Sequence, residues 1–225
     1  MPVHLHDTGP AGPYVRACDK PYLIRCSDDG GMIVYILGGF LGSGKTTFLK
    51  TVTRHYLDSG KKVAILVNEM GDIGVDGSTL RSEGFKAVEL PDGCICCTLT
   101  QSLFEAVAGI KEEIDPDVFI VEPTGLALPQ KVRDTIVSTG TDVKDISIIG
   151  IVDVPRFDIF LERKKEFFLE QISESDIILV NKADGQPAEK VEGILSFLKD
   201  LYDLPALVVS GKTLEGVDRF LEALR

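Results

Sequence analysis

The sequence predicts an α/β fold of three layers, in which a mostly parallel β-sheet is covered by helices on both faces. Two features of the chain lead to this prediction. Short apolar runs of strand-like composition recur along the 225 residues, and segments long enough for helices separate them. Such alternation is typical of parallel sheets, because each connection between parallel strands has to cross the sheet. With 44% hydrophobic residues, the chain can also bury one substantial core.

Six apolar runs have the length and composition of strands. They are Met32–Leu37, Val63–Val67, Val118–Val121, Ile146–Val152, Ile177–Val180 and Ala206–Val209. Between them, apolar residues return at intervals of three and four, as they do on one face of a helix. The helices expected from this periodicity are Thr47–Leu57, Leu103–Ile114, Lys131–Ser138, Phe157–Ile172, Ala188–Leu201 and Val217–Leu224. We therefore expect a single domain over residues 32–225.

Residues 1–31 fit this alternation poorly and are expected to form an N-terminal extension. Their proline and glycine residues argue against a helix. Only Tyr22–Cys26 has the composition of a short strand, and Asp28–Gly31 has the residues of a turn that could lead it back towards Met32. We expect this segment to add a strand or a strap to the domain.

Composition and charge exclude several classes of function. The net charge of −11 arises from acids spread along the chain, which opposes binding to a phosphate backbone, so nucleic acid is not an expected partner. The sequence shows neither a targeting segment nor an apolar run of eighteen residues, so no membrane partner is expected. Five cysteines, three of them within four residues, do not form a disulfide framework. A cytoplasmic location is expected.

A phosphate-binding loop follows the first central strand. Residues Gly39 to Thr46 match the pattern G-x-x-x-x-G-K-[ST] between an expected strand and an expected helix, as this motif requires. Its glycines allow backbone N–H groups to surround a phosphate, Lys45 can reach the β- and γ-phosphates, and the Thr46 hydroxyl can bind Mg²⁺. The fold is therefore expected to be a P-loop NTPase. The nucleotide-binding residues predicted here are Gly39, Gly42, Ser43, Gly44, Lys45, Thr46 and Thr47.

A second magnesium-binding oxygen is expected at the end of a buried strand. The run Asp117 to Glu122 ends in a carboxylate, which makes Glu122 the candidate Walker B acid beside Thr46. The next residues, Pro123-Thr124-Gly125, would bring a backbone N–H, that of Gly125, to the γ-phosphate. We expect switch-like behaviour here.

A guanine-reading loop follows the strand Ile177–Val180. Asn181-Lys182-Ala183-Asp184 matches N-K-x-D. The Asp184 carboxylate can accept hydrogen bonds from guanine N1–H and from the exocyclic amine, Lys182 can lie over the ring, and Asn181 can hold the loop. Adenine has no such pair of donors. Ser210-Gly211-Lys212, after the last strand, can present N–H groups to the guanine O6.

Three cysteines form a possible metal site at Cys94, Cys96 and Cys97. Thiolates suit Zn²⁺, Co²⁺, Ni²⁺ or Cu⁺, and three of them leave one tetrahedral position open, as a carrier needs. Buried structural thiols and a redox pair are the alternatives. His4, His6, Cys18 and Cys26 give a weaker signal of the same kind.

Five motifs together resemble one family. The phosphate loop, Asn68 to Asp76, Gly93 to Cys97, Glu122 to Gly125 and Asn181 to Asp184 occur in the order seen in CobW-like GTPases, which are grouped with the HypB and UreG nickel chaperones. The resemblance covers about residues 32–225. It implies a metallochaperone that links binding and hydrolysis of GTP to delivery of a transition metal, Zn²⁺ or Co²⁺ rather than Ni²⁺.

The resemblance also implies catalytic residues and partners. By similarity, Glu69 and Asp72 lie in the first switch and join Lys45 and Glu122 as catalytic residues, while a client metalloenzyme or cofactor-biosynthesis protein receives the metal. A nucleotide-dependent homodimer is a further expectation. The chain departs from the family at Met70 and Asp72, where N-E-F-G-E-I-G is usual. Since only one expected helix follows Ser210, we do not expect the family's second C-terminal domain within these residues.

Other functions remain open at this point. A GTPase switch could gate assembly or cofactor loading of a partner while the cysteines hold a permanent structural zinc. A P-loop kinase is less consistent with the guanine motif. Since no arginine is evident near the switch motifs, we expect slow intrinsic hydrolysis of GTP.

Overall fold

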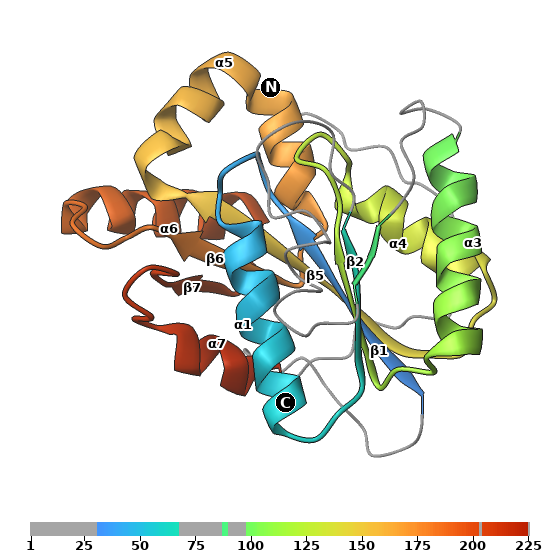
Figure 1. Cartoon of the computed structure of the whole chain (residues 1–225). Coiled ribbons are helices and arrows are strands. Elements are labelled where there is room, and N and C mark those ends of the chain that lie inside the picture. Colours follow the sequence, from blue (N-terminus) through green and yellow to red (C-terminus); the bar gives the residue numbers. More distant parts are fainter. Residues whose placement is uncertain (1–30, 68–86, 90–97, 203, 225) are drawn as a thin grey trace.

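A computed structural model describes residues 31–67, 87–89, 98–202 and 204–224 of the chain. In these residues a seven-stranded sheet has the order β3-β2-β4-β1-β5-β6-β7 (Figure 1). Every recorded strand pair is parallel. The predicted three-layer α/β fold is confirmed. The strand expected at Tyr22–Cys26 lies outside the described residues.

The strands agree with the prediction in position, with differences at their ends. They are β1 Met32–Gly38, β2 Val63–Val67, β3 Ala87–Glu89, β4 Val118–Glu122, β5 Val143–Asp153, β6 Ile177–Asn181 and β7 Ala206–Val208. The sequence analysis missed β3, which is only three residues long. β5 begins at Val143 rather than Ile146, because Met32 and Ile33 of the central strand extend the pairing to Val143 and Asp145.

The helices also occupy the expected segments. They are α1 Lys45–Asp58, α3 Thr98–Glu113, α4 Pro129–Ser138, α5 Phe157–Ser173, α6 Ala188–Tyr202 and α7 Val217–Ala223. α3 begins at Thr98 rather than Leu103, because its first residues lack the apolar periodicity used to predict it. A short 3₁₀ helix that was not predicted, η1 Val154–Arg156, joins β5 to α5.

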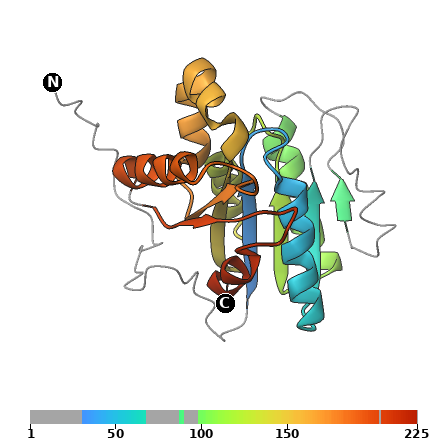
Figure 2. The same ribbon diagram turned by 90° about the vertical axis from the view of Figure 1, so that its left-hand side faces the viewer.

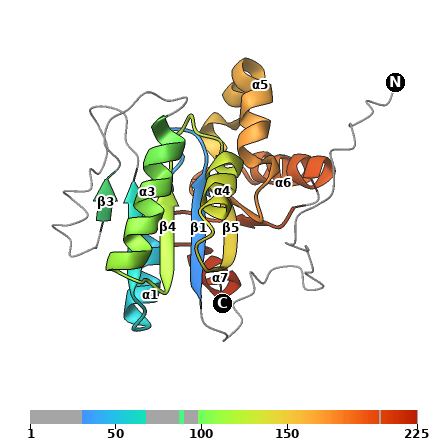
Figure 3. The ribbon, with the colours of Figure 1, turned by 90° about the vertical axis from the view of Figure 1, so that its right-hand side faces the viewer.

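The apolar side chains of β1 alternate between the two faces of the sheet. Tyr35 and Leu37 pack in one core with α1 and α7, and Val34 and Ile36 pack in another with α3 and α4. Figure 2 shows α1 and α7 on the first face, and Figure 3 shows α3 and α4 on the opposite face. A third core lies between β5, β6 and helices α5 and α6. No helix in the described ranges has the length and hydropathy needed to cross a bilayer.

The carboxyl ends of the central strands meet at one edge of the sheet. β1 leads there into the predicted phosphate loop, and β4, β5 and β6 end at Glu122, Asp153 and Asn181. Asp153 and Asn181 are paired in register. Ligands of open parallel α/β sheets bind beyond this edge, and the fold brings the phosphate loop, Glu122 and Asn181 to it.

Candidate nucleotide-binding site

The phosphate loop has a backbone conformation that requires glycine. Gly39, Gly42 and Gly44 have φ values of 137°, 73° and 111°. A Cβ at Gly39 would lie 2.5 Å from the Ile151 carbonyl oxygen, and one at Gly44 would lie 2.4 Å from Asn181 Nδ2. Glycine is therefore required by conformation and by close approach. Because α1 begins at Lys45, its positive N-terminal end adjoins the loop.

Lys45 is a buried cation folded back over the loop. Its Nζ donates to the Gly39 and Phe40 carbonyl oxygens at 3.1 and 3.3 Å, and the residue is 6% exposed. Burial lowers the pKa of Lys45, the carboxylate of Glu122 opposes this effect, and the charge of Arg156 adds to it. A bound phosphate group would place a negative charge beside this ammonium group and would stabilise its charged form.

Thr46 and Glu122 meet at the start of α1. The Thr46 hydroxyl donates to Glu122 Oε1 at 3.0 Å, and Glu122 is 8% exposed. A hydroxyl and a buried carboxylate are the oxygen ligands that Mg²⁺ takes in nucleotide sites, so these two residues fit the magnesium site predicted from the sequence.

The loop after β4 packs directly against the phosphate loop. A Cβ at Gly125 would lie 2.6 Å from the Leu41 nitrogen, so only glycine allows this approach. Gly125 is therefore next to the phosphate loop. Its contact with a γ-phosphate stays a prediction.

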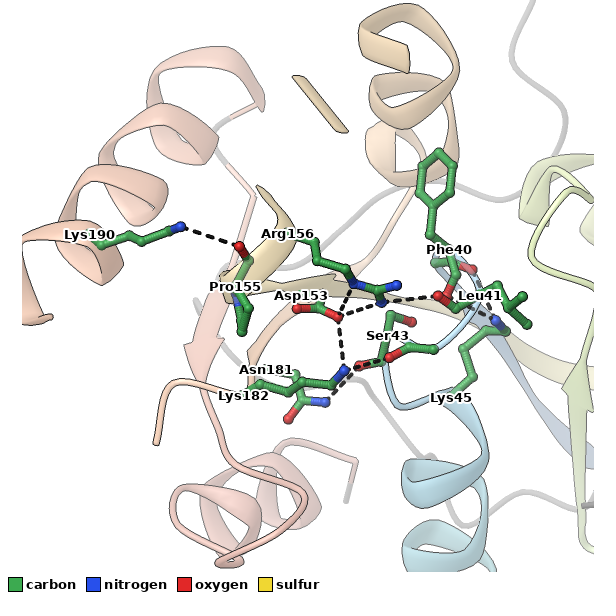
Figure 4. Close-up of polar contacts among 12 residues, drawn as sticks. Phe40, Leu41, Ser43, Lys45, Asp153, Pro155, Arg156, Asn181, Lys182 and Lys190 are labelled. Carbon is green, nitrogen blue, oxygen red and sulfur yellow. Dashed lines mark hydrogen bonds and ion pairs between the residues drawn. The ribbon is translucent and has the colours of Figure 1, made fainter. Parts of the chain in front are cut away.

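The amide of Asn181 joins three loops. Its Nδ2 donates to the Ser43 carbonyl oxygen at 2.7 Å, and its Oδ1 accepts from the Gly211 N–H at 3.0 Å. The residue is 2% exposed. The predicted guanine loop, the phosphate loop and the loop after β7 are thus held together by one buried side chain (Figure 4 shows its bond to Ser43).

The other predicted guanine residues surround Asn181. Lys182 donates from Nζ to the Gly42 carbonyl oxygen at 2.6 Å, and the Ser210 hydroxyl donates to Asp184 Oδ1 at 2.7 Å. An added Cβ at Gly211 would lie 2.9 Å from a methyl carbon of Thr47, so this loop adjoins the start of α1. Lys212 follows it and is exposed.

Two site residues were missed by the sequence analysis. Asp153, whose side chain is 1% exposed, accepts bonds at Oδ2 from Arg156 Nε at 2.8 Å and from Lys182 Nζ at 2.9 Å. Arg156 Nη2 also donates to the Leu41 carbonyl oxygen at 3.0 Å. An arginine therefore contacts the phosphate loop, a position that the sequence analysis did not consider. A possible signal was the sequence Asp153-Val154-Pro155-Arg156 directly after a buried strand.

Several predicted residues lie outside the described part of the chain. They are Glu69, Asp72, Cys94, Cys96, Cys97, His4, His6, Cys18 and Cys26. Among the described residues, no three His, Cys, Asp or Glu side chains are grouped closely enough to hold a metal ion. The strand before the cysteine segment is described, and its last residue, Glu89, is in register with Val67, which is in turn in register with Glu122.

The fold and the loop geometry define a P-loop nucleotide-binding protein. A profile of the family described as "CobW/HypB/UreG, nucleotide-binding domain" matches residues 33–204. The chain belongs to this family, which confirms the resemblance drawn from its motifs.

Curated relatives are similar over the same region. The zinc chaperone YeiR of Escherichia coli is 33% identical over 164 residues, covering 71% of this chain and 49% of the relative. The zinc-regulated GTPase metalloprotein activator 1 of Schizosaccharomyces pombe is 34% identical over 164 residues, covering 67% and 39%. The chain thus spans half or less of the length of these two relatives.

Solved structures share the fold. The hydrogenase maturation factor HypB from Archaeoglobus fulgidus has a TM-score of 0.61 at 19% identity, covering 85% of this chain and 88% of that one. The Zn(II)-bound YjiA GTPase of Escherichia coli has a TM-score of 0.57 at 24% identity, covering 80% and 58%. At these identities the likeness supports the fold alone.

Proposed function

We propose that this chain is the GTP-binding and GTP-hydrolysing domain of a metallochaperone, in which nucleotide state controls binding and delivery of a transition metal. One observation carries the nucleotide part of the proposal. The Asn181 side chain bonds to Ser43, and this contact supports one site made by the guanine loop and the phosphate loop. Membership of the CobW/HypB/UreG family supports the link to metal.

In this proposal each loop has a separate task. Asp184 accepts hydrogen bonds from guanine, while backbone N–H groups of the phosphate loop, that of Gly42 among them, and the ammonium of Lys45 bind the phosphates. Thr46 and Glu122 would hold Mg²⁺, which would supply positive charge to offset that of the phosphates. Glu69 and Asp72 remain our candidates for residues of the first switch.

The proposed cargo is Zn²⁺, held by the thiolates of Cys94, Cys96 and Cys97. The names of the curated relatives, a zinc chaperone and a zinc-regulated activator, favour zinc over Co²⁺ and Ni²⁺. A three-thiolate set leaves room for a ligand from the recipient. The proposed recipient is a client metalloprotein in the cytoplasm, and a nucleotide-dependent homodimer is the assembly we expect for transfer.

The described strands suggest how the two sites communicate. The segment that contains the cysteines begins after Glu89, and the segment with the first switch begins after Val67. Both residues are in register with each other, and Val67 is in register with Glu122. At the usual spacing of neighbouring strands, Glu89 and Glu122 are about 10 Å apart at one edge of the sheet. In this proposal, a structural change beside Glu122 on loss of the γ-phosphate is transmitted across β2 to Glu89, after which the cysteine segment begins.

Metal affinity in different nucleotide states tests the coupling. Zn²⁺ affinity is measured by competition with a chromogenic chelator in apo, GDP-bound and non-hydrolysable-GTP-bound protein. We expect affinities that differ by about 5- to 150-fold between states, with a reciprocal effect of Zn²⁺ on GTP. Cys96→Ser and Cys97→Ser should abolish the dependence. Equal Zn²⁺ affinity in all three states would instead favour a permanent structural zinc.

A further inference from the structure

Two cations share one buried carboxylate beside the phosphate loop. Asp153 Oδ2 accepts from Arg156 Nη2 at 2.5 Å and from Lys182 Nζ at 2.9 Å. Each cation also donates to a carbonyl of the loop, Arg156 to Leu41 at 3.0 Å and Lys182 to Gly42 at 2.6 Å. Figure 4 shows these side chains converging between the loop and the end of β5. Through Oδ2 and these two cations, Asp153 is linked to the carbonyl groups of two successive loop residues, Leu41 and Gly42.

The bond from Arg156 sets the direction of one N–H group. The peptide between Leu41 and Gly42 is trans and planar, so its N–H points opposite to its carbonyl. With the Leu41 carbonyl directed at Arg156, the Gly42 N–H is directed away from it. The next N–H, that of Ser43, closes a turn to the Phe40 carbonyl at 3.0 Å. No bond is recorded from the Gly42 N–H to any described residue, which leaves this donor for a ligand.

Arg156 is itself held from several sides. Its guanidinium carbon lies 5.2 Å from the ring centre of Phe160, and Phe160 is stacked on Phe40 of the phosphate loop at 4.3 Å. Lys190 of α6 donates to the carbonyl oxygen of Pro155 at 3.5 Å and is paired with Asp158 at 2.8 Å. Arg156 therefore contacts the loop directly through the Leu41 carbonyl, and indirectly through the ring of Phe160, which is stacked on Phe40.

We propose that Arg156 and Asp153 are positioning residues for nucleotide binding. Arg156 orients the Leu41–Gly42 peptide so that the Gly42 N–H faces the phosphates, and Asp153 holds Arg156 and Lys182 together so that the phosphate and guanine loops keep one spacing. This inference rests on the proposed binding of GTP at these loops. In this inference Arg156 positions the phosphate loop only, whereas Asp153 positions both the phosphate loop and the guanine loop.

This division of tasks has a measurable consequence. Arg156→Ala should lower the affinity for GTP and for GDP by about tenfold each, which corresponds to the loss of one charge-assisted hydrogen bond at a partly exposed group. Inosine triphosphate lacks the exocyclic amine that Asp184 reads, so the ratio of GTP to inosine triphosphate affinity reports the guanine loop alone. Arg156→Ala should leave this ratio unchanged. Asp153→Asn should lower both the affinity and the ratio, because it releases Lys182 as well.

The test measures binding of fluorescent GTP, GDP and inosine triphosphate to the full chain, together with unfolding by urea. Arg156→Lys is the conservative variant, and it should recover part of the affinity because an ammonium can still donate to the Leu41 carbonyl. Arg133→Ala is the matched control. It removes another ion-paired arginine, whose Nη2 lies 2.5 Å from Oδ2 of Asp176, just before β6 and at the opposite edge of the sheet. It should change stability without changing nucleotide affinity.

The outcomes separate this inference from the proposed function. Affinity of Arg156→Ala within twofold of the parent would overturn the positioning role. So would a loss of affinity in Arg133→Ala equal to that in Arg156→Ala, or a fall in the nucleotide ratio in Arg156→Ala. If the unmutated protein itself failed to bind GTP, the proposed function would fail first, whatever the variants did.

Discussion

Replacing Asn181 by alanine should damage both stability and nucleotide binding. The side chain is 2% exposed, donates to the Ser43 carbonyl at 2.7 Å and accepts from the Gly211 N–H at 3.0 Å. Asn181→Ala leaves the buried Ser43 carbonyl unpaired, which costs about 1–3 kcal/mol, while the Gly211 N–H is half-buried and can reach water. We expect the free energy of unfolding to fall by about 2–3 kcal/mol and GTP affinity to fall by more than tenfold.

Two further variants sharpen this prediction. Asn181→Asp keeps the size and can still accept from Gly211, but it has no N–H for the Ser43 carbonyl and sets a negative charge against it. It should be at least as destabilising as Asn181→Ala. Gln171→Ala is the matched control, because it removes another buried amide, which donates to the Ala127 carbonyl at 2.8 Å. Gln171→Ala should lower the free energy of unfolding with little effect on the affinity for GTP.

Unfolding in urea and titration with a fluorescent GTP analogue measure the two effects separately. A free energy of unfolding for Asn181→Ala within about 0.5 kcal/mol of the parent would refute the reasoning, since surface changes have effects of that size. Equal loss of GTP affinity in Asn181→Ala and Gln171→Ala would also contradict it, because the loss would then follow general destabilisation.

Three other predictions concern the phosphate side of the site. Burial lowers the pKa of Lys45, and phosphate charge would raise this pKa again, so GTP binding at alkaline pH below the ordinary lysine pKa should take up a proton. Calorimetry in buffers of different ionisation enthalpy measures this uptake, which Lys45→Ala should lose. Glu122→Gln should still bind GTP but lose the effect of Mg²⁺ on affinity, and a Mg²⁺ titration that matched the parent would contradict this. Intrinsic hydrolysis should be slow, on the order of 10⁻⁴ to 10⁻² s⁻¹, and turnover of several per second without a partner would contradict it.

Slow hydrolysis is expected even though an arginine lies at the phosphate loop. The sequence analysis relied on the lack of an arginine near the switch motifs, yet Arg156 contacts the phosphate loop. Its guanidinium is already bonded to Asp153 and to the Leu41 carbonyl, so those donors are not free to follow charge that develops during phosphoryl transfer. A partner that supplies an arginine would still be needed for fast turnover.

The parts of the site that follow buried strands could be predicted from the sequence. The phosphate loop, Glu122 and Asn181 each come directly after an apolar run, and parallel strands bring their carboxyl ends to one edge of the sheet. The strand Ala87–Glu89 could not be predicted in this way, because three residues give too short a pattern to recognise.

The missed pair shows where local patterns stop being informative. Asp153 and Arg156 belong to no motif, and an acid three residues before an arginine is common on protein surfaces. Their position depends on the neighbouring strand, since Asp153 is in register with Asn181 and Arg156 reaches Leu41, 115 residues earlier in the chain. Such contacts between distant segments follow from strand order, which one sequence does not reveal.

The central claim, that the two loops form one guanine-nucleotide site, is tested most directly by competition between nucleotides. GTP, ATP and xanthosine triphosphate compete for a fluorescent GDP analogue on the parent and on Asp184→Asn, in the presence of Mg²⁺. The parent should prefer GTP over ATP by at least about tenfold to a hundredfold, the contribution expected from the Asp184 carboxylate. Asp184→Asn should shift the preference to xanthosine triphosphate, whose C2 oxygen accepts from an amide. Equal affinity of the parent for GTP and ATP, with no shift in the variant, would contradict the account.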